Sequence, residues 1–144
     1  MVKISRILVA VDGSENADRA FEYGAYIAKQ CEAEQLLIIN VIEGFGRNIG
    51  AWEKHDSVVK DLEHSSNELL KKYKSKALSQ AFTTTEVIRA AGNAGEEILR
   101  TAEREKIDTI VIGSRGLSTA SELLLGSVSH NVIHNSKCPV VIIR

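Results

Sequence analysis

The residues with the clearest potential for chemistry form a glycine-bearing loop. Gly113-Ser-Arg-Gly116 is followed, after nine residues, by Gly126-Ser127. The loop directly follows the β-branched run Thr109–Ile112 and leads into a predicted helix. Glycine lets a ligand approach the main chain closely, and the first amides of a helix are donors that can face an anion. The spacing therefore favours a phosphate site, with a nucleotide as the natural ligand.

Two better-known phosphate loops are excluded. The sequence contains no GxxxxGK[ST] motif. Gly44-Phe-Gly46 begins a dinucleotide fingerprint, but the third glycine is Gly50, one position late. The pattern alone leaves two interpretations open, a nucleotide site and a plain turn that follows a strand.

The elements around the loop alternate between apolar runs and helical periodicity. Strands are predicted at Arg6–Val11, Gln35–Ile42, Thr83–Ala90, Thr109–Ile112 and Val140–Ile143. Helices are predicted at Glu15–Cys31, Ser57–Gln80, Glu96–Glu105 and Ser127–Asn135. Most of the strands are continuous apolar runs, which is typical of parallel strands covered on both faces. The alternation predicts a three-layer α/β fold with right-handed crossovers.

The length and composition of the chain limit the classes of protein to which it can belong. We expect the 144 residues to form one domain, 1–144. The 18 basic and 19 acidic side chains give a formal charge of −1, which offers no electrostatic case for nucleic-acid binding. No apolar run approaches the roughly 20 residues that cross a bilayer, and no signal peptide is evident. Cys31 and Cys138 are expected to be buried free thiols in the cytoplasm.

The glycine pattern resembles the ATP-binding signature of the universal stress protein family. Ile7–Ser14 resembles the first strand of that family with its acidic ligand, Leu36–Val41 the second strand and Cys138–Ile143 the last. The resemblance covers essentially the whole chain. It implies a doubly wound, five-stranded parallel sheet of order 3-2-1-4-5, in the Rossmann-like, adenine nucleotide α-hydrolase-like class.

In such sheets a ligand binds where the strand order reverses, here between the strands that end at Asp12 and Gly113. The resemblance implies that Asp12 bonds the ribose or holds a metal through water, and that Val41 meets adenine through its main chain. The implied ligand is ATP, with Mg²⁺ bound through the phosphates. The full set of implied ligand-binding residues is Ala10, Val11, Asp12, Val41, Gly113, Ser114, Arg115, Gly116, Gly126, Ser127, Val128 and Ser129.

Simpler interpretations exist for several of these residues. Asp12-Gly-Ser14 is common turn chemistry, with Ser14 as a helix N-cap, and Arg115 is equally well a solvated side chain. His130 and His134 share a helical face, but no third ligand is evident, so we expect a surface pair and not a metal site. No catalytic residue is identified.

The predicted function is that of a cytoplasmic ATP-binding stress-response regulator. The apolar edge strand predicts a homodimer through Val140, Val141, Ile142 and Ile143, and an unidentified protein partner is expected in addition. The alternatives are a nucleotide-independent interaction module, a slow ATPase, and a phosphotransfer protein. Whether Glu43–Asp56, with Trp52, forms a lid over the site is left open.

Overall fold

The computed structural model describes residues 1–43, 56–80, 84–116 and 125–144. The question of a lid containing Trp52 therefore falls outside the described residues. The strands are β1 (Arg6–Ala10), β2 (Gln35–Ile42), β3 (Thr85–Ala91), β4 (Thr109–Gly113) and β5 (Val140–Ile143). The helices are α1 (Glu15–Gln30), α3 (Asp56–Ser79), α4 (Ala94–Arg104) and α5 (Ser127–Asn135).

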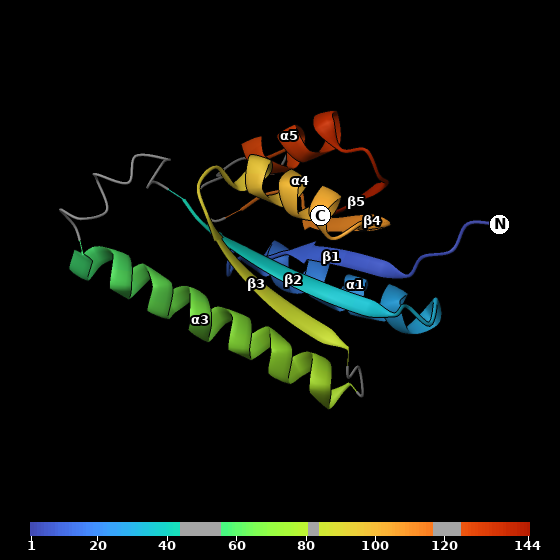
Figure 1. Ribbon diagram of the computed structural model, residues 1–144, viewed down its shortest axis with the longest axis horizontal. Helices are drawn as coiled ribbons and strands as arrows, with labels where there is room; N and C mark the ends of the chain where they lie inside the picture. The colour runs from blue at the N-terminus through green and yellow to red at the C-terminus, as the bar shows by residue number, and fades with distance from the viewer. Residues whose placement is uncertain (44–55, 81–83, 117–124) are drawn as a thin grey trace.

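The strands form one parallel sheet in the order β3-β2-β1-β4-β5 (Figure 1). β1 lies at its centre, where Ile7 pairs with Leu36 of β2 on one side and with Thr109 of β4 on the other. The predicted doubly wound order is confirmed. It places the reversal of strand order between β1 and β4, so the carboxyl ends of these two strands lie side by side.

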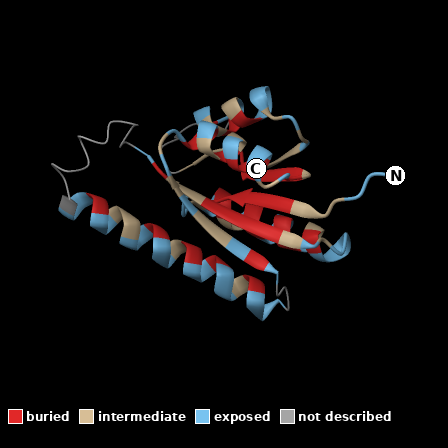
Figure 2. Ribbon diagram, viewed as in Figure 1, coloured by how far each residue is buried: buried red, intermediate tan, exposed pale blue. Residues whose placement is uncertain are grey.

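Helices cover both faces of the sheet (Figure 1). Alternate residues of β1 belong to two separate cores, since Ile7 and Val9 pack with α1 and α3, whereas Leu8 and Ala10 pack with α4 and α5. The central strands are accordingly buried along their length (Figure 2). This two-sided burial explains why their sequences are apolar without alternation.

Two details of the predicted helices are wrong. Cys31 is exposed, because α1 ends at Gln30 and Cys31 is the C-cap residue rather than a member of the apolar face. Cys138 is half-buried, and both cysteines are free. The helical spacing of Val58 with Leu62 and Leu69 predicts that Val58 faces inward on α3, but the inward-facing valine is Val59, and Val58 is 47% exposed.

α4 begins two residues earlier than the periodicity predicts. Asn93 has an extended backbone, and its side chain accepts a hydrogen bond from the amide of Glu96 over 3.0 Å. This N-cap satisfies one of the first-turn donors and fixes the start of the helix at Ala94. The apolar period begins only with Ile98, which is why the sequence pattern placed the start too late.

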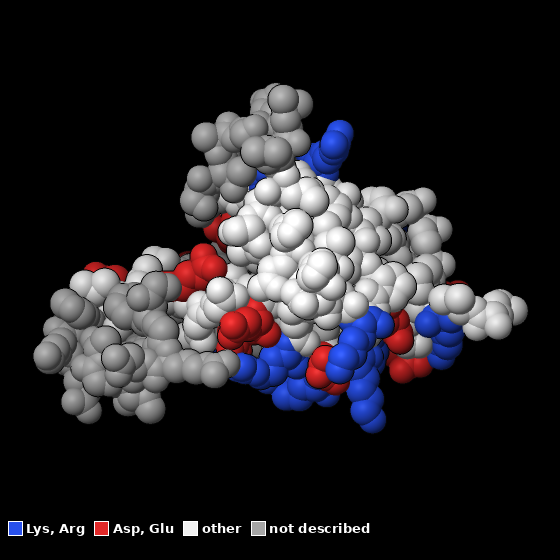
Figure 3. Space-filling view, turned by 90° about the horizontal axis from the view of Figure 1, so that it is seen from above, with Lys and Arg blue, Asp and Glu red and all other residues white. Residues whose placement is uncertain are grey.

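In the space-filling view blue and red side chains mix along one edge, around an uncharged centre, and no large area of one sign appears on the face shown (Figure 3). Within the described residues, no helix is both long and apolar enough to span a bilayer.

Candidate functional site

A pocket of about 480 Å³ opens at the carboxyl ends of β1, β2 and β4. This volume lies within the usual range for small-molecule sites, roughly 300–1,000 Å³. Its lining brings together nearly all of the predicted ligand-binding residues. The predicted residues that line it are Ala10, Val11, Asp12, Val41, Gly113, Arg115, Gly116, Gly126, Ser127, Val128 and Ser129.

Asp12 lines the pocket just after the end of β1. Its Oδ1 accepts a hydrogen bond from the amide of Ser14 over 2.9 Å, and Gly13 between them has φ +90°. The turn chemistry suggested for this tripeptide is therefore present. The other oxygen, Oδ2, faces Gly116, because a Cβ built on that glycine would lie only 2.5 Å from it. The turn interpretation of Asp12 is thus confirmed, and its role as a ligand stays a prediction.

The first turn of α5 forms another part of the pocket lining. Its N-cap is Gly126, which has an extended backbone and no side chain with which to cap the helix. The first turn contains no acidic residue. Within the described part of the chain, no hydrogen bond satisfies the main-chain amides of Ser127, Val128 and Ser129. Such a helix end provides donors and a partial positive charge for an anion.

Ser114 is the predicted site residue that does not line the pocket. It is buried under the loop, and its carbonyl accepts hydrogen bonds from the Gly126 amide at 2.7 Å and from the Ser129 hydroxyl at 2.9 Å. Its own hydroxyl accepts from Asn16 over 3.2 Å. Ser114 therefore joins the end of β4 to the start of α5 and lies outside the pocket lining.

Gly113 is required by packing, which is a different reason from the one the sequence suggested. A Cβ there would lie 2.8 Å from the Cβ of Asn16 and 3.1 Å from its main-chain carbon. The missing side chain lets the first turn of α1 rest directly on the end of β4. Gly116 is the glycine of the loop whose missing side chain leaves room beside a pocket carboxylate.

Sequence reasoning missed the contributions of α3 and α4. The wall that faces β1 and β2 comes from one stripe of α3, and Ala94 and Ile98 of α4 add further lining. The lining residues from α3 are Leu62, Ser65, Ser66 and Leu69. Leu62 and Leu69 share a helical spacing, and the available signal was the polar Ser66 between them, which is buried.

Asn40 on β2 was also missed. Its Nδ2 donates to the carbonyl of Val11 over 2.7 Å, and its Oδ1 accepts from the Ser66 hydroxyl at 2.7 Å. The residue links α3 to the segment that carries Asp12. A polar residue in an otherwise apolar strand, Leu36–Ile42, was the available signal.

The pocket has two ends built from different elements, one from β2 and α3 and the other from the glycine loop and the start of α5. Ile39, Val41 and Leu62 lie at one end, where β2 continues past its last pair with β1, Ala10–Ile39. The amides of α5 lie at the other end with Arg115, which is the one cationic side chain among the described residues that line the pocket. The acidic lining side chains are Asp12 and Glu43, and Glu43 accepts a hydrogen bond from the amide of Ala94 over 3.3 Å.

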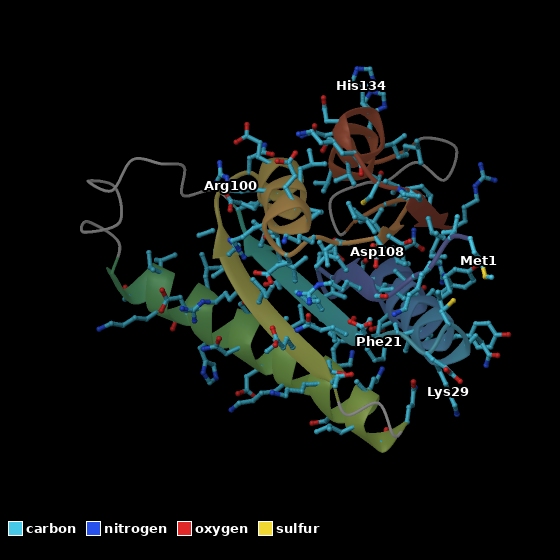
Figure 4. All side chains as sticks on the ribbon, turned by 45° about the vertical axis from the view of Figure 1, so that its right-hand side comes forward. Met1, Phe21, Lys29, Arg100, Asp108 and His134 are labelled. Carbon is cyan, nitrogen blue, oxygen red and sulfur yellow. The ribbon has the colours of Figure 1, made fainter. Side chains whose placement is uncertain are left out.

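The histidine pair does not belong to this site. His130 and His134 stack on the exposed side of α5 with ring centroids 6.2 Å apart, and His134 projects away from the sheet (Figure 4). Among the described residues no group of three His, Cys, Asp or Glu side chains is placed to hold a metal ion.

Known proteins are similar to this chain in both sequence and architecture. The universal stress protein family model matches residues 3–144. The universal stress protein YxiE of Bacillus subtilis is 34% identical, over 97% of this chain and 99% of its own length. The solved structure of protein MJ0577 is 31% identical with a TM-score of 0.86, covering 99% of this chain and 96% of that one.

A further solved structure is a universal stress protein in complex with cAMP. It is 26% identical with a TM-score of 0.77, and the match covers 99% of both chains. The two solved structures share the fold over nearly the whole of this chain, and the curated relative matches it over nearly its full length. This chain belongs to the universal stress protein family.

Proposed function

We propose that this chain is a cytoplasmic regulator that binds ATP in the pocket between β1 and β4. The observation that carries the proposal is the first turn of α5, with Gly126 at its N-cap, which lines the same pocket as Asp12. An anion binds the first element and sugar hydroxyls suit the second. The cAMP complex of a relative supports an adenine nucleotide as the ligand class.

The lining fits such a ligand from end to end. The base would occupy the end beside Val41 and Leu62, where the main chain of β2 runs past the end of β1. The ribose would lie over Asp12, and the phosphates would reach the Ser127–Ser129 amides. Gly116 supports this placement, because any side chain there would meet the Asp12 carboxylate.

Mg²⁺ would enter with the phosphates rather than occupy a protein cage. Mg²⁺ keeps several waters and is often held by one or two carboxylates together with substrate phosphates. Asp12 is the lining carboxylate that faces the phosphate loop, and so it is the residue that would hold the ion, directly or through water. Glu43 is engaged at the start of α4.

Binding is proposed here, and rapid hydrolysis is not. Phosphoryl transfer needs a positioned nucleophile and stabilisation of the charge on the transferred group. Arg115 supplies one cation at the end beside α5, and no lysine is found among the lining residues that the structure describes. The nucleotide would therefore act as a bound signal, and hydrolysis would be slow.

The test is a thermal melt with and without MgATP on the wild type, Gly116→Ala and Asp12→Ala. Ligand at ~100 times its dissociation constant stabilises a native protein by about 2.7 kcal/mol. We expect a clear shift for the wild type and little for either variant. Ser79→Ala, at the far end of α3 from the pocket lining, is the control that should shift like the wild type.

No shift in wild-type protein that is free of carried-over nucleotide would contradict the proposal. It would favour a nucleotide-independent interaction module instead. Repeating the melt with AMP, ADP and cAMP would then separate ligands that share the base and ribose contacts but differ in phosphate.

We further propose a homodimer through the edge strand β5. Val140, Val141, Ile142 and Ile143 remain half-buried in the single chain, and β5 has β4 on one side only. Apolar edges of this kind are usually paired or covered. Light scattering at micromolar concentration should give the dimer mass, and Val141→Lys should give the monomer mass. A monomeric wild type would contradict this part of the proposal.

A further inference from the structure

A second layer of polar residues lies directly beneath the phosphate end of the pocket. Asn16 and Ser114 are 5% and 6% exposed, and neither lines the pocket. They are joined by the hydrogen bond from Asn16 Nδ2 to Ser114 Oγ. Ser114 in turn fixes Gly126 and Ser129, which do line it.

Arg19 continues this layer outward to the edge of the sheet. Its Nη2 donates to Asn16 Oδ1, and its Nε donates to the main-chain oxygen of Arg144 over 3.0 Å. Arg144 directly follows β5. The side chain of Arg19 is itself exposed and does not line the pocket.

The continuous chain of hydrogen bonds therefore runs from the end of β5 to the first turn of α5. It passes through Arg144, Arg19, Asn16, Ser114 and Ser129. A second link is parallel to it, because the Ser114 amide donates to the Ile143 carbonyl over 2.7 Å. Arg19 orients Asn16 so that its amide nitrogen, and not its oxygen, faces Ser114.

We propose that Arg19 is a positioning residue for the phosphate-binding loop, acting through Asn16 and Ser114, and that it ties this loop to the edge strand β5. The inference rests on the proposed nucleotide site. It assigns to an exposed arginine on α1 a selective effect on the phosphate end of that site. The base end, built from β2 and α3, has no contact with this chain of hydrogen bonds in the described residues.

The test compares the dissociation constants of MgATP and adenosine for wild type and Arg19→Ala. We expect MgATP to bind roughly 5- to 10-fold more weakly to the variant, as for a lost hydrogen bond, and adenosine to change less than ~2-fold. The midpoint of urea unfolding is measured in parallel, because a general loss of structure would weaken both ligands alike. Arg104→Ala is the control, because Arg104 is the last residue of α4, pairs with the neighbouring Glu105 and does not line the pocket.

A double-mutant cycle separates positioning from direct contact. Arg19 and Arg115 both border a small hollow beside Gly116, so a direct contact of Arg19 with a long phosphate chain must be distinguished. If Arg19 acts through Asn16, the double variant Arg19→Ala/Asn16→Ser should bind MgATP no more weakly than Asn16→Ser alone. Additive losses would mean direct contact and would overturn the positioning role.

The possible failures are distinguishable. If the wild type binds MgATP and Arg19→Ala binds it equally well, this inference is wrong and the proposed function stands. If adenosine weakens as much as MgATP, the effect is structural and the inference is again wrong. If the wild type binds neither ligand, the proposed function fails and this inference fails with it.

Discussion

The N-termini of α1 and α5 both border the same pocket, and the chain treats them in opposite ways. At α1 the Ser14 hydroxyl accepts from the amide of Ala17 over 3.1 Å, and Glu15 and Asp18 add negative charge to the first turn. At α5 the N-cap is Gly126, and no acidic residue follows it in the first turn. The start of α1 is therefore capped by side chains of the fold, whereas the described residues provide no such cap for α5.

The helix starts differ in whether side chains of the fold cap the first turn. At α1 and α4 a capping side chain accepts a hydrogen bond from a first-turn amide, and acidic residues in the first turn complement the helix dipole. The cap is Ser14 at α1 and Asn93 at α4. An anion bound at either helix would have to displace these groups. At α5 it would displace none that the structure describes.

The largest expected effect comes from giving α5 a capping side chain with a negative charge, because α1 has both a cap and acidic residues in its first turn. Gly126→Asp introduces a capping carboxylate at the phosphate end of the pocket. Loss of a charge-assisted hydrogen bond together with like-charge repulsion should weaken MgATP binding by roughly 100-fold, about 2.7 kcal/mol, while the cap leaves stability unchanged or slightly higher. Isothermal titration calorimetry and urea unfolding measure the two quantities.

Gly126→Asn is the matched control for that substitution. Asparagine caps a helix about as well as aspartate but carries no charge. It should therefore weaken MgATP binding much less than aspartate does. Equal binding by wild type and Gly126→Asp would show that α5 is not the phosphate site.

A smaller effect, on stability, is expected where α1 rests on the glycine loop. In Gly113→Ala the new Cβ meets the main chain of Asn16, which cannot move aside cheaply. Overpacking of this kind costs about 1–3 kcal/mol. Gly116→Ala is the matched variant, because its Cβ meets only a carboxylate oxygen. Urea unfolding should show a loss for Gly113→Ala and little for Gly116→Ala, and the reverse order would contradict this account.

Removing the cap of α1 should be milder still, and it should not affect binding. Ser14→Ala loses the hydrogen bond to the Ala17 amide and should destabilise the protein by about 1 kcal/mol. The dissociation constant of MgATP, measured by titrating folded variant to saturation, should stay within ~3-fold of the wild-type value. A large loss of affinity with unchanged stability would mean that α1, too, contacts the ligand.

The smallest effect concerns the acidic first turn of α1 and is dependent on pH. The Tyr73 hydroxyl, helped by the charges of Lys72 and Lys76, holds the pKa of Asp18 below its usual value, against a smaller opposing effect of burial. A lowered folded-state pKa stabilises the protein above the unfolded pKa, and that stability is lost as the pH falls through the folded one. Burial and the hydrogen bond to Asp18 raise the pKa of Tyr73.

Tyr73→Phe isolates this pair. At pH ~7 the variant should be less stable by about 1 kcal/mol or less, because Asp18 is partly exposed, and the difference should shrink as the pH falls below ~4 and Asp18 becomes protonated. Urea unfolding of both proteins at several pH values measures this difference in stability. A stability difference between wild type and variant that stays constant over the acid range would show that it does not come from the contact with Asp18. It would point instead to a change in how the ring of residue 73 packs against Phe21.

The sequence predicts the fold better than it predicts the site, for a physical reason. Strands such as Gln35–Ile42 and the helix Ser127–Asn135 are defined by local periodicity and caps, and the structure has them at those bounds. The order of the strands followed from the resemblance and is confirmed. Cys31 was misplaced because helical periodicity continues through a residue that is already the C-cap.

The site depends on packing between elements that are distant in the sequence. The glycine loop and Asp12 could be joined through the rule for doubly wound sheets, but Ser65 and Ser66 reach the pocket only because α3 crosses β2 and β3. Gly113 and Ser114 fit the motif, yet one packs against Asn16 and the other lies beneath the loop. A motif predicts which segment matters, whereas packing decides which atoms face the ligand.

The pairing of β1 with β4 has a consequence for how the protein is made. Ile7 pairs with Thr109, and the amides of Ser5 and Arg6 both donate to the carboxylate of Asp108 over 2.8 Å. The two walls of the pocket therefore come from opposite ends of the chain and meet only after a long loop has closed, which is a slow class of folding event. If the pocket binds ATP as proposed, a partly synthesised chain cannot form this site. The nucleotide would then bind only the folded molecule, and its binding would shift the folding equilibrium toward that state.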